Sequence, residues 1–401
     1  MRFNVRELGG GLGDAGLFIP IAVAMIALNG LNATAVFAVA GLVYAGTALY
    51  FRVPVPVQPL KAFAAAAIAL HLSAETLAAG ALLMSAAMAV LAVTGTAGWL
   101  AERFPTALVR GIQASVALLL AKAAIELAQK GNWDGLPGID PSVSLFVAAA
   151  CCVLLLVVAG DRWLPGSLMV LGAGAAIGIG VDGLPSGVGI GPEGIAWSLP
   201  SGPDFATALT ALVLAQIPLT FGNSVVATAD AERAYFGERA RRVDPRRLAS
   251  SISIANVAAG MTGGLPVCHG AGGVTAHYRL GARTAGATLM AGVLYVTLGI
   301  VLGASLPAFL HLLAPGALAG MLLFVAIQHA MLAGQLERLD DRILAAGIGL
   351  ITLLAGNLAI GAGAGIVALV LRALLRRRVG APQPRPGWDD ARGPGTARSV
   401  R

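Results

Sequence analysis

The feature that most constrains the fold of this sequence is a succession of apolar runs, each close to the length of a membrane-spanning helix. A spanning helix needs about 20 mostly apolar residues. Charged residues make up only 12% of the chain, against about 25% in an ordinary soluble domain. The sequence therefore predicts an all-α polytopic membrane protein. The runs lie at 12–30, 33–51, 76–98, 104–127, 142–160, 163–181, 204–229, 250–264, 284–305 and 307–331.

Two further segments combine apolar residues with proline and glycine. They are VPVPVQPLKAFAAAAIAL at 53–70 and GLPVCHGAGGVTAHY at 264–278. Proline keeps the residue before it extended, so each segment is predicted to be an extended lead-in followed by a half-helix. The last apolar stretch, 343–371, is too long for one span and contains interior glycines, which predicts a hairpin of two short spans. The total is about 14 transmembrane segments.

The chain repeats this arrangement at half its length. A polar break in the apolar run at 13–24 recurs at 216–229, and each is followed about 45 residues later by one of the two broken segments. Seven segments precede the second half, and an odd number turns it upside down relative to the first. Inverted repeats with paired discontinuous helices indicate a secondary-transport site near the membrane midplane. We predict a first repeat at 1–200, a second at 201–372 and a disordered cytoplasmic tail at 373–401.

The distribution of charge predicts the topology. Arginines fall in alternate loops, as the positive-inside rule requires when both termini are cytoplasmic. The N-terminal residues lack a cleavable signal pattern, which predicts a protein of the inner membrane. Although the net charge is +7, no basic face is interleaved with aromatic residues, so nucleic-acid binding is not expected. The basic run 237–248 is interpreted as a solvated loop, with an anionic-lipid patch as the alternative.

Half-helices that begin inside the membrane indicate anion binding. Their first N–H groups lack intrahelical partners, and the helix dipole places about half a positive charge there. At the start of the first half-helix, Gln58 can donate two hydrogen bonds and Lys61 adds a positive charge. The alternative for Lys61 is snorkelling to the interface. At the second half-helix, Gly270 would let the backbone approach a ligand closely.

Other polar residues are candidates for the same site. Gln216 and Asn223 share a helical face in the eighth span, with interhelical hydrogen bonding as the alternative role. Cys268 and His269 begin the second half-helix, and His269 could instead be a packing residue bonded to a backbone carbonyl. The three cysteines of the chain form no pattern of metal ligands, so no metal site and no cofactor are predicted.

Asp14 is the candidate for coupling, because a carboxylate in the bilayer is costly and often functional. It could take a proton or a cation that accompanies the anion, pair with Lys61, or lie solvated at the interface. Lys122 and Glu126 lie four residues apart, a spacing at which opposite charges pair on one helix face. We interpret that pair as structural.

At these residues the sequence resembles the molybdate transporter family, which is related to sulfate permeases and, more distantly, to uracil permeases. The resemblance covers roughly residues 5–372, and its sharpest motifs are PVQPLK at 56–61 and PVCHGAGG at 266–273. It implies a seven-plus-seven inverted repeat with a core and a gate domain, and a site between the first, third, eighth and tenth spans. It implies molybdate as substrate. The lack of a regulatory domain after the spans favours this branch over the sulfate permeases.

The sequence leaves several alternatives for the function of the protein open. A sulfate or general anion transporter would have the same architecture, and the sequence does not distinguish proton from sodium coupling. A nucleobase symporter would be expected to carry a carboxylate in the eighth span, where this chain has Gln216 and Asn223. A homodimer is compatible with the fold. The absence of a nucleophile–base pattern and of a P-loop argues against an enzyme or an ATP-driven pump.

Overall fold

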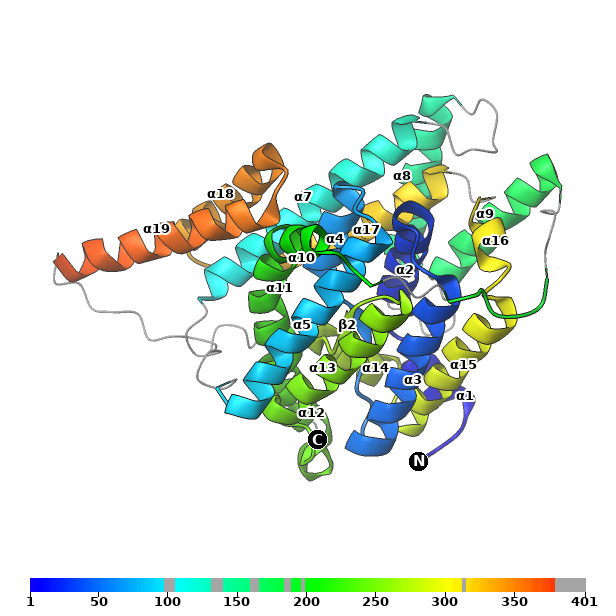
Figure 1. Cartoon of the computed structure of the whole chain (residues 1–401), viewed down its shortest axis with the longest axis horizontal. Coiled ribbons are helices and arrows are strands. Elements are labelled where there is room, and N and C mark those ends of the chain that lie inside the picture. The colour runs from blue at the N-terminus through cyan, green and yellow to red at the C-terminus, as the bar shows by residue number, and fades with distance from the viewer. Residues whose placement is uncertain are drawn as a thin grey trace.

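The fold is built from helices of very unequal length, as shown in a computed structural model (Figure 1). It describes residues 1–96, 105–130, 140–158, 166–183, 189–195, 199–311 and 315–378. The α-helices are α1 (Val5–Gly11), α2 (Ala15–Asn29), α3 (Ala33–Phe51), α4 (Lys61–Ala69), α5 (Ala74–Thr94), α7 (Thr106–Lys130), α8 (Pro141–Val158), α9 (Gly166–Asp182), α10 (Gly202–Ala208), α11 (Leu214–Leu219), α12 (Ala227–Phe236), α13 (Pro245–Thr262), α14 (Ala271–Leu280), α15 (Gly286–Leu302), α16 (Leu306–His311), α17 (Pro315–Ala333), α18 (Leu339–Ala355) and α19 (Leu358–Arg378).

Within the described residues, each predicted apolar run is helical over most of its length. In the described part of the chain, seven helical segments are long and apolar enough to cross a membrane, and the pair α1 and α2, bent by 51°, would make an eighth. Helix α15, with 17 residues, is apolar but falls just short of that length, and the half-helices α4 and α14 have only 9 and 10 residues. The protein is therefore a multi-pass helical membrane protein, and the figure of about 14 segments stays a prediction.

The eighth span differs from a simple helix. From Gly202 to Phe236 the chain runs through α10, α11 and α12 with two π-helical segments between them, η1 (Leu209–Val213) and η2 (Thr220–Val226). π-Helical turns are rare in proteins, and those that do occur often lie at functional sites. The segment that holds Gln216 and Asn223 is thus irregular where the sequence has its polar break.

The two broken segments form the only β-structure among the described residues. Strand β1 (Gln58–Pro59) pairs antiparallel with β2 (Val267–Cys268), with Gln58 opposite Cys268 and Pro59 opposite Val267. Helix α4 follows β1 and helix α14 follows β2. The predicted pattern of an extended lead-in followed by a half-helix is confirmed in both halves.

The helices pack in two groups. One joins α3 to α15, α5 to α13 and α12 to α14, and the other joins α7 to α8, α17, α18 and α19. The groups meet where α4 packs against α7 and α2 packs against α17. Within the first group α3 and α15 approach closely at Gly41 and Gly292, where a methyl group on Gly41 would lie 2.5 Å from the Gly292 carbonyl oxygen. Small residues allow such approach between membrane helices.

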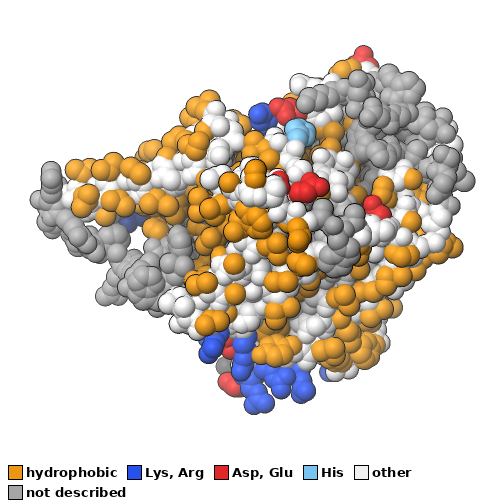
Figure 2. Space-filling model, in the orientation of Figure 1, with side chains coloured by type: hydrophobic (Ala, Val, Ile, Leu, Met, Phe, Trp, Pro, Cys, Tyr) orange, Lys and Arg blue, Asp and Glu red, His pale blue; other side chains and the backbone are white. Residues whose placement is uncertain are grey.

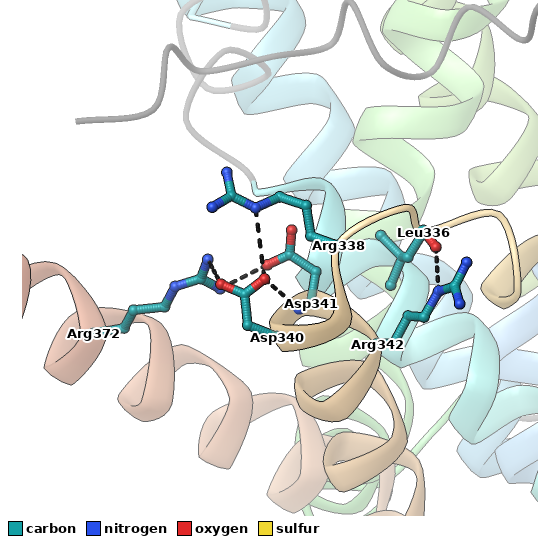
Figure 3. Close-up of polar contacts among 6 residues, drawn as sticks. All are labelled: Leu336, Arg338, Asp340, Asp341, Arg342 and Arg372. Atoms are coloured by element: carbon teal, nitrogen blue, oxygen red, sulfur yellow. Dashed lines mark hydrogen bonds and ion pairs between the residues drawn. The ribbon is translucent and has the colours of Figure 1, made fainter. Parts of the chain in front are cut away.

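The end of the chain forms the predicted hairpin. Helices α18 and α19 pack against each other, and Gly356 between them has a left-handed backbone with φ of 61°. Arg372 on α19 pairs with Asp340 and with Asp341, the latter at 2.6 Å, while Arg338 lies 3.5 Å from Asp340 (Figure 3). The helix α19 extends to Arg378, beyond the predicted boundary at 372. The rest of the predicted tail lies outside the described residues.

The surface is consistent with a bilayer environment. Figure 2 shows hydrophobic side chains spread over most of the visible face, with Lys and Arg gathered at the end where α12 and the N-terminus lie. Exposed apolar residues such as Leu354, Val367 and Leu375 are normal where the solvent is lipid.

Candidate functional site

The starts of the two half-helices lie side by side because their lead-ins are paired. Beyond the β1–β2 pairing, the N–H of Leu60, the N-cap of α4, donates to the carbonyl of Pro266 at 3.0 Å. The residues at the two helix starts are more than 200 positions apart in the sequence, yet backbone hydrogen bonds fix one against the other. The two N-terminal ends therefore form one rigid unit.

Side chains from neighbouring helices complete the hydrogen bonds of these lead-ins. Asn256 on α13 bonds both backbone groups of Val267, at 2.8 and 3.0 Å. The hydroxyl of Thr228 on α12 donates to the carbonyl of His269 at 2.6 Å. Buried backbone groups must find partners, and these polar side chains supply them in place of a long strand.

The ring of His269 is part of this scaffold. Its Nδ1 lies 2.8 Å from the carbonyl oxygen of Pro56, and its Nε2 lies 2.9 Å from the hydroxyl of Ser251. The residue is fully buried. The geometry is that of the packing alternative stated above for His269, and both ring nitrogens already have partners.

Gln216 also has partners, and one of them is the helix end itself. Its Oε1 accepts the N–H of Phe63 in the first turn of α4 at 2.8 Å, and its Nε2 donates to Thr220 at 2.7 Å. The N-cap Leu60 has no side-chain acceptor to offer, so Gln216 acts as a cap from another helix. This bond places the eighth span directly at the α4 N-terminus.

Some backbone N–H groups in the first turns of α4 and α14 have no acceptor within the described structure and are available to a ligand. At α14, the N–H of Gly273 bonds back to Gly270 at 2.9 Å. No acceptor among the described residues takes the N–H groups of Ala62 or Gly272. Gly272 is exposed, and a methyl group there would meet nothing within 4 Å. Open space therefore lies beside Gly272 in the first turn of α14.

Gln58 lies across this end of α14. A methyl group on Gly270 would overlap Oε1 of Gln58, and one on Gly273 would lie 2.5 Å from its Nε2. The buried Oε1 of Gln58 has no hydrogen-bond partner in the described structure. The methyl position on Gly270 is also 3.3 Å from Nδ2 of Asn223. Gln58, Asn223 and Gly270 thus lie next to one another, and their role in binding a ligand stays a prediction.

Lys61 and Cys268 flank the two helix starts. Lys61 is the first residue of α4 and is half-buried, and its charge interacts with Asp14 and Cys268. The thiol of Cys268 lies 3.8 Å from the carbonyl oxygen of Pro59. Lys61 is thus positioned inside the helix bundle, where its ammonium group supplies positive charge next to the α4 N-terminus.

Asp14 lies in a buried cluster that sequence reasoning only partly anticipated. Its Oδ1 accepts the hydroxyl of Tyr44 at 2.6 Å and lies 3.2 Å from Nε2 of His277, with the angle of that contact unsuited to a hydrogen bond. Its Oδ2 is buried without a partner among the described residues. The alternative pairing with Lys61 is not formed within 4 Å. His277 had no sequence signal beyond its position on the second half-helix.

Two other predicted features are outside this centre. Lys122 and Glu126 form the expected pair at 3.7 Å, exposed on α7. The basic run 237–248 lies at a hollow of about 400 Å³ lined by Arg52, Arg239, Arg241 and Arg242 among others. Within the described ranges, no group of three or more His, Cys, Asp or Glu residues is placed to hold a metal ion.

Comparison with known proteins identifies the family that carries this arrangement. The family described as "Molybdate transporter of MFS superfamily" matches residues 6–120 and 208–328, which include both half-helices and the eighth span. The chain belongs to the molybdate transporter family. Among curated members, Molybdate transporter 2 of Arabidopsis thaliana is 27% identical over 91% of this chain and 86% of its own length. Molybdate transporter 1 of Chlamydomonas reinhardtii is 25% identical over 80% of this chain and 82% of its own length.

Solved structures show which fold this molybdate transporter family member adopts. The transmembrane domain of the cyanobacterial bicarbonate transporter BicA superposes with a TM-score of 0.66 at 16% identity, covering 90% of this chain and 98% of that one. The murine anion transporter Slc26a9 in its inward-facing state gives a TM-score of 0.67 at 15% identity, covering 94% and 69%. The chain therefore has the inverted-repeat fold of these transporters. It is a transporter rather than an enzyme.

Proposed function

We propose that this protein is a secondary-active transporter of molybdate, which it holds between the N-terminal ends of α4 and α14. The observation that carries the proposal is the antiparallel pairing of β1 and β2, which fixes the two helix ends next to each other. The family match supports an anion as substrate, and the relatives named molybdate transporters support molybdate in particular.

The chemistry of the site suits a tetrahedral dianion. Each helix end contributes roughly half a positive charge and N–H donors, and Lys61 adds a full charge. Gln58 and Asn223 have amide groups that can donate to oxyanion oxygens. Gly270 and Gly273 leave the room that these groups need at the backbone. Gln216 supports the site by capping α4, and His269 by holding the lead-in.

The two packing groups of helices supply the moving parts. Helix α14 packs within the first group and the β1–β2 pairing ties α4 to it, while α7 of the other group contacts α4 and α17 contacts α2. Alternating access then consists of one group moving against the other around a fixed anion site. Asp14 is the proposed coupling residue, which takes a proton or sodium ion, because it is buried with one oxygen unpartnered.

Three further proposals concern the setting of the protein. An inner-membrane location and cytoplasmic termini are supported by the arginine-rich end of the molecule, where the N-terminus lies. The two predicted repeats, 1–200 and 201–372, are supported by the matched half-helices. A homodimer is proposed on the fold alone, and cross-linking in native membranes would test it.

Uptake of labelled molybdate into proteoliposomes at submicromolar concentration, with excess sulfate as competitor, tests the proposed function. Saturable uptake that resists sulfate is the expected result, and Gln58→Ala should weaken it. Uptake abolished by equimolar sulfate would replace the molybdate assignment by a general sulfate-type carrier. No uptake under any imposed proton or sodium gradient would overturn the proposed function.

A further inference from the structure

A buried histidine lies in the second packing group, on a helix that contacts the first group through α2. His329 lies near the C-terminal end of α17, the helix that packs against α2 and α7 where the two groups meet. The side chain is only 2% exposed. Its ring is close enough to Lys61, the first residue of α4, for the two positive charges to repel each other. No sequence motif singled out this residue.

The hydrogen bonding of His329 fixes which ring nitrogen is available. Its Nδ1 lies 2.9 Å from the carbonyl oxygen of Val325. A carbonyl only accepts, so in the neutral ring the hydrogen is on Nδ1 and Nε2 carries a lone pair. Nε2 is buried and has no hydrogen-bond partner among the described residues. A buried polar atom without a partner is costly, and the lone pair of Nε2 is available to take a proton.

Lys61 is the charged group that acts on this ring. On α7, Arg110 bonds Gln113 and Gln335, while Lys122 and Glu126 pair with each other at the surface. On α2 the charged group is Asp14 at its N-cap, which has its own partners in Tyr44 and His277. Helix α8 contributes the thiols of Cys151 and Cys152, and no charged side chain of α9 is described.

We propose that His329 takes up a proton on Nε2 when a dianion enters the site, so that anion and proton move together. With the site empty, Lys61 opposes a second positive charge nearby. Two negative charges between the helix ends offset Lys61, and the new Nε2–H donates to an oxygen of the anion. The proton comes from the water on the side to which the site is open, and it leaves with the anion on the other side.

This inference rests on the proposed function but adds a residue to it. His329 belongs to the packing group that contains neither half-helix, so protonation of its ring and binding of the anion join the two groups electrostatically. The side-chain contacts of Asp14 are instead with Tyr44 on α3 and His277 on α14, both in the first group. The inference therefore identifies an anion-linked proton site at the boundary between the groups.

Isothermal titration calorimetry of the full-length protein with molybdate at about pH 7, in buffers of different ionisation enthalpy, counts the protons taken up per anion. The wild type should take up a proton fraction that rises toward one as the pH falls. In His329→Asn the amide can still donate to Val325 but nothing replaces Nε2. Proton uptake per anion should therefore fall by the share that His329 contributes, leaving only what Asp14 takes up, and affinity should fall about tenfold or more, as for a lost charge-assisted hydrogen bond. His71→Asn removes an exposed histidine with left-handed backbone and should change neither.

The outcomes separate the two proposals. Molybdate binding by the wild type without proton uptake, or undiminished proton uptake in His329→Asn, would overturn the inference and leave the proposed function standing. No molybdate binding or uptake by the wild type would overturn both. If His329→Asn fails to fold, His329→Gln, which places a non-titrating amide near the position of Nε2, gives the same comparison.

Discussion

Nε2 of His277 lies 3.2 Å from Oδ1 of Asp14, joining the second half-helix to the start of the first span. Tyr44 donates to the same oxygen, and the stacked rings of Tyr44 and His277 enclose it. Oδ2 is left buried without a partner in the described structure. The carboxyl group is therefore held in place at one oxygen while the other can receive a cation or a proton.

Replacing Asp14 by Asn should uncouple transport while preserving the fold. The amide keeps the shape and can still accept from Tyr44, but it cannot change charge. Uptake driven by an ion gradient should fall about tenfold or more, the cost of losing one charged interaction. Proteoliposome uptake with and without imposed proton and sodium gradients measures this. Glu126→Gln, at the exposed pair on α7, is the control, and an unchanged gradient dependence in Asp14→Asn would refute the role.

Replacing Gly270 by Ala should act through Gln58. The added methyl group overlaps the end of a flexible side chain, so Gln58 turns away and the protein still folds. Molybdate affinity should drop by about as much as in Gln58→Ala. Because both changes remove the same group, the double variant should bind like either single one.

The control for this series is Gly46→Ala, since a methyl group at that position of α3 meets nothing within 4 Å. Binding by calorimetry and thermal melting should both stay close to the wild type there. Additive losses in the double variant would show that Gly270 and Gln58 act separately.

Gln216 allows the structural and binding contributions of the eighth span to be separated. Gln216→Ala leaves the buried N–H of Phe63 without an acceptor and should cost about 1–3 kcal/mol of unfolding free energy. Gln216→Glu keeps an acceptor at the same place, so stability should largely return, but its negative charge should repel the anion. Thermal melting and molybdate binding, measured on both variants, check this. Equal stability of the Ala variant and the wild type would exclude the capping role.

The α18–α19 hairpin should depend on pH through Asp340. Burial is the largest single effect on the Asp340 carboxyl and opposes its ionisation. Arg372, Arg338 and backbone N–H donors together outweigh burial and hold the pKa of Asp340 below its ordinary value of 3.8. A lowered pKa stabilises the fold above the unfolded value, and that stability is lost as the pH falls through the folded value. Arg372→Ala should therefore reduce stability at neutral pH by no more than about 1 kcal/mol, as expected for exposed pairs.

Melting curves of Arg372→Ala and the wild type should converge below about pH 3.8, the ordinary value for this group. Arg246→Ala, an exposed residue of α13, controls for the loss of one surface charge. A difference between Arg372→Ala and the wild type that persists unchanged in acid would show that Arg372 acts through packing instead.

The sequence predicted the helices and the half-helix starts because those features are local. Apolar length defines a span, and Pro56 or Pro266 interrupts it wherever the rest of the chain lies. Gln58 and Gly270 were predicted for the same reason, since both are at a helix start. Whether an atom of Gln216 faces a ligand or a backbone N–H depends on the packing of α11 against α4, which no sequence spacing encodes.

The histidines show this limit most clearly. His269 lies in the second broken segment and was considered for the ligand, yet Pro56 and Ser251 occupy both ring nitrogens. His277 lies further along the same segment and His329 lies in a regular helix, and only the fold brings them to Asp14 and Lys61. A polar residue in a membrane helix can be recognised as unusual from sequence, but its partner is identified only in three dimensions.

The pairing of β1 with β2 also determines when this protein can finish folding. While the ribosome is still making the first half, the extended segment before α4 has no strand to bond to, because Val267 and Cys268 do not yet exist. Its unpaired backbone N–H and C=O groups are unstable in the hydrocarbon core of the bilayer, where each would raise the free energy by several kcal/mol. The nascent first half must therefore stay in the translocon, in a protected or partly inserted form, until the second half emerges, and biogenesis should be most vulnerable in that interval.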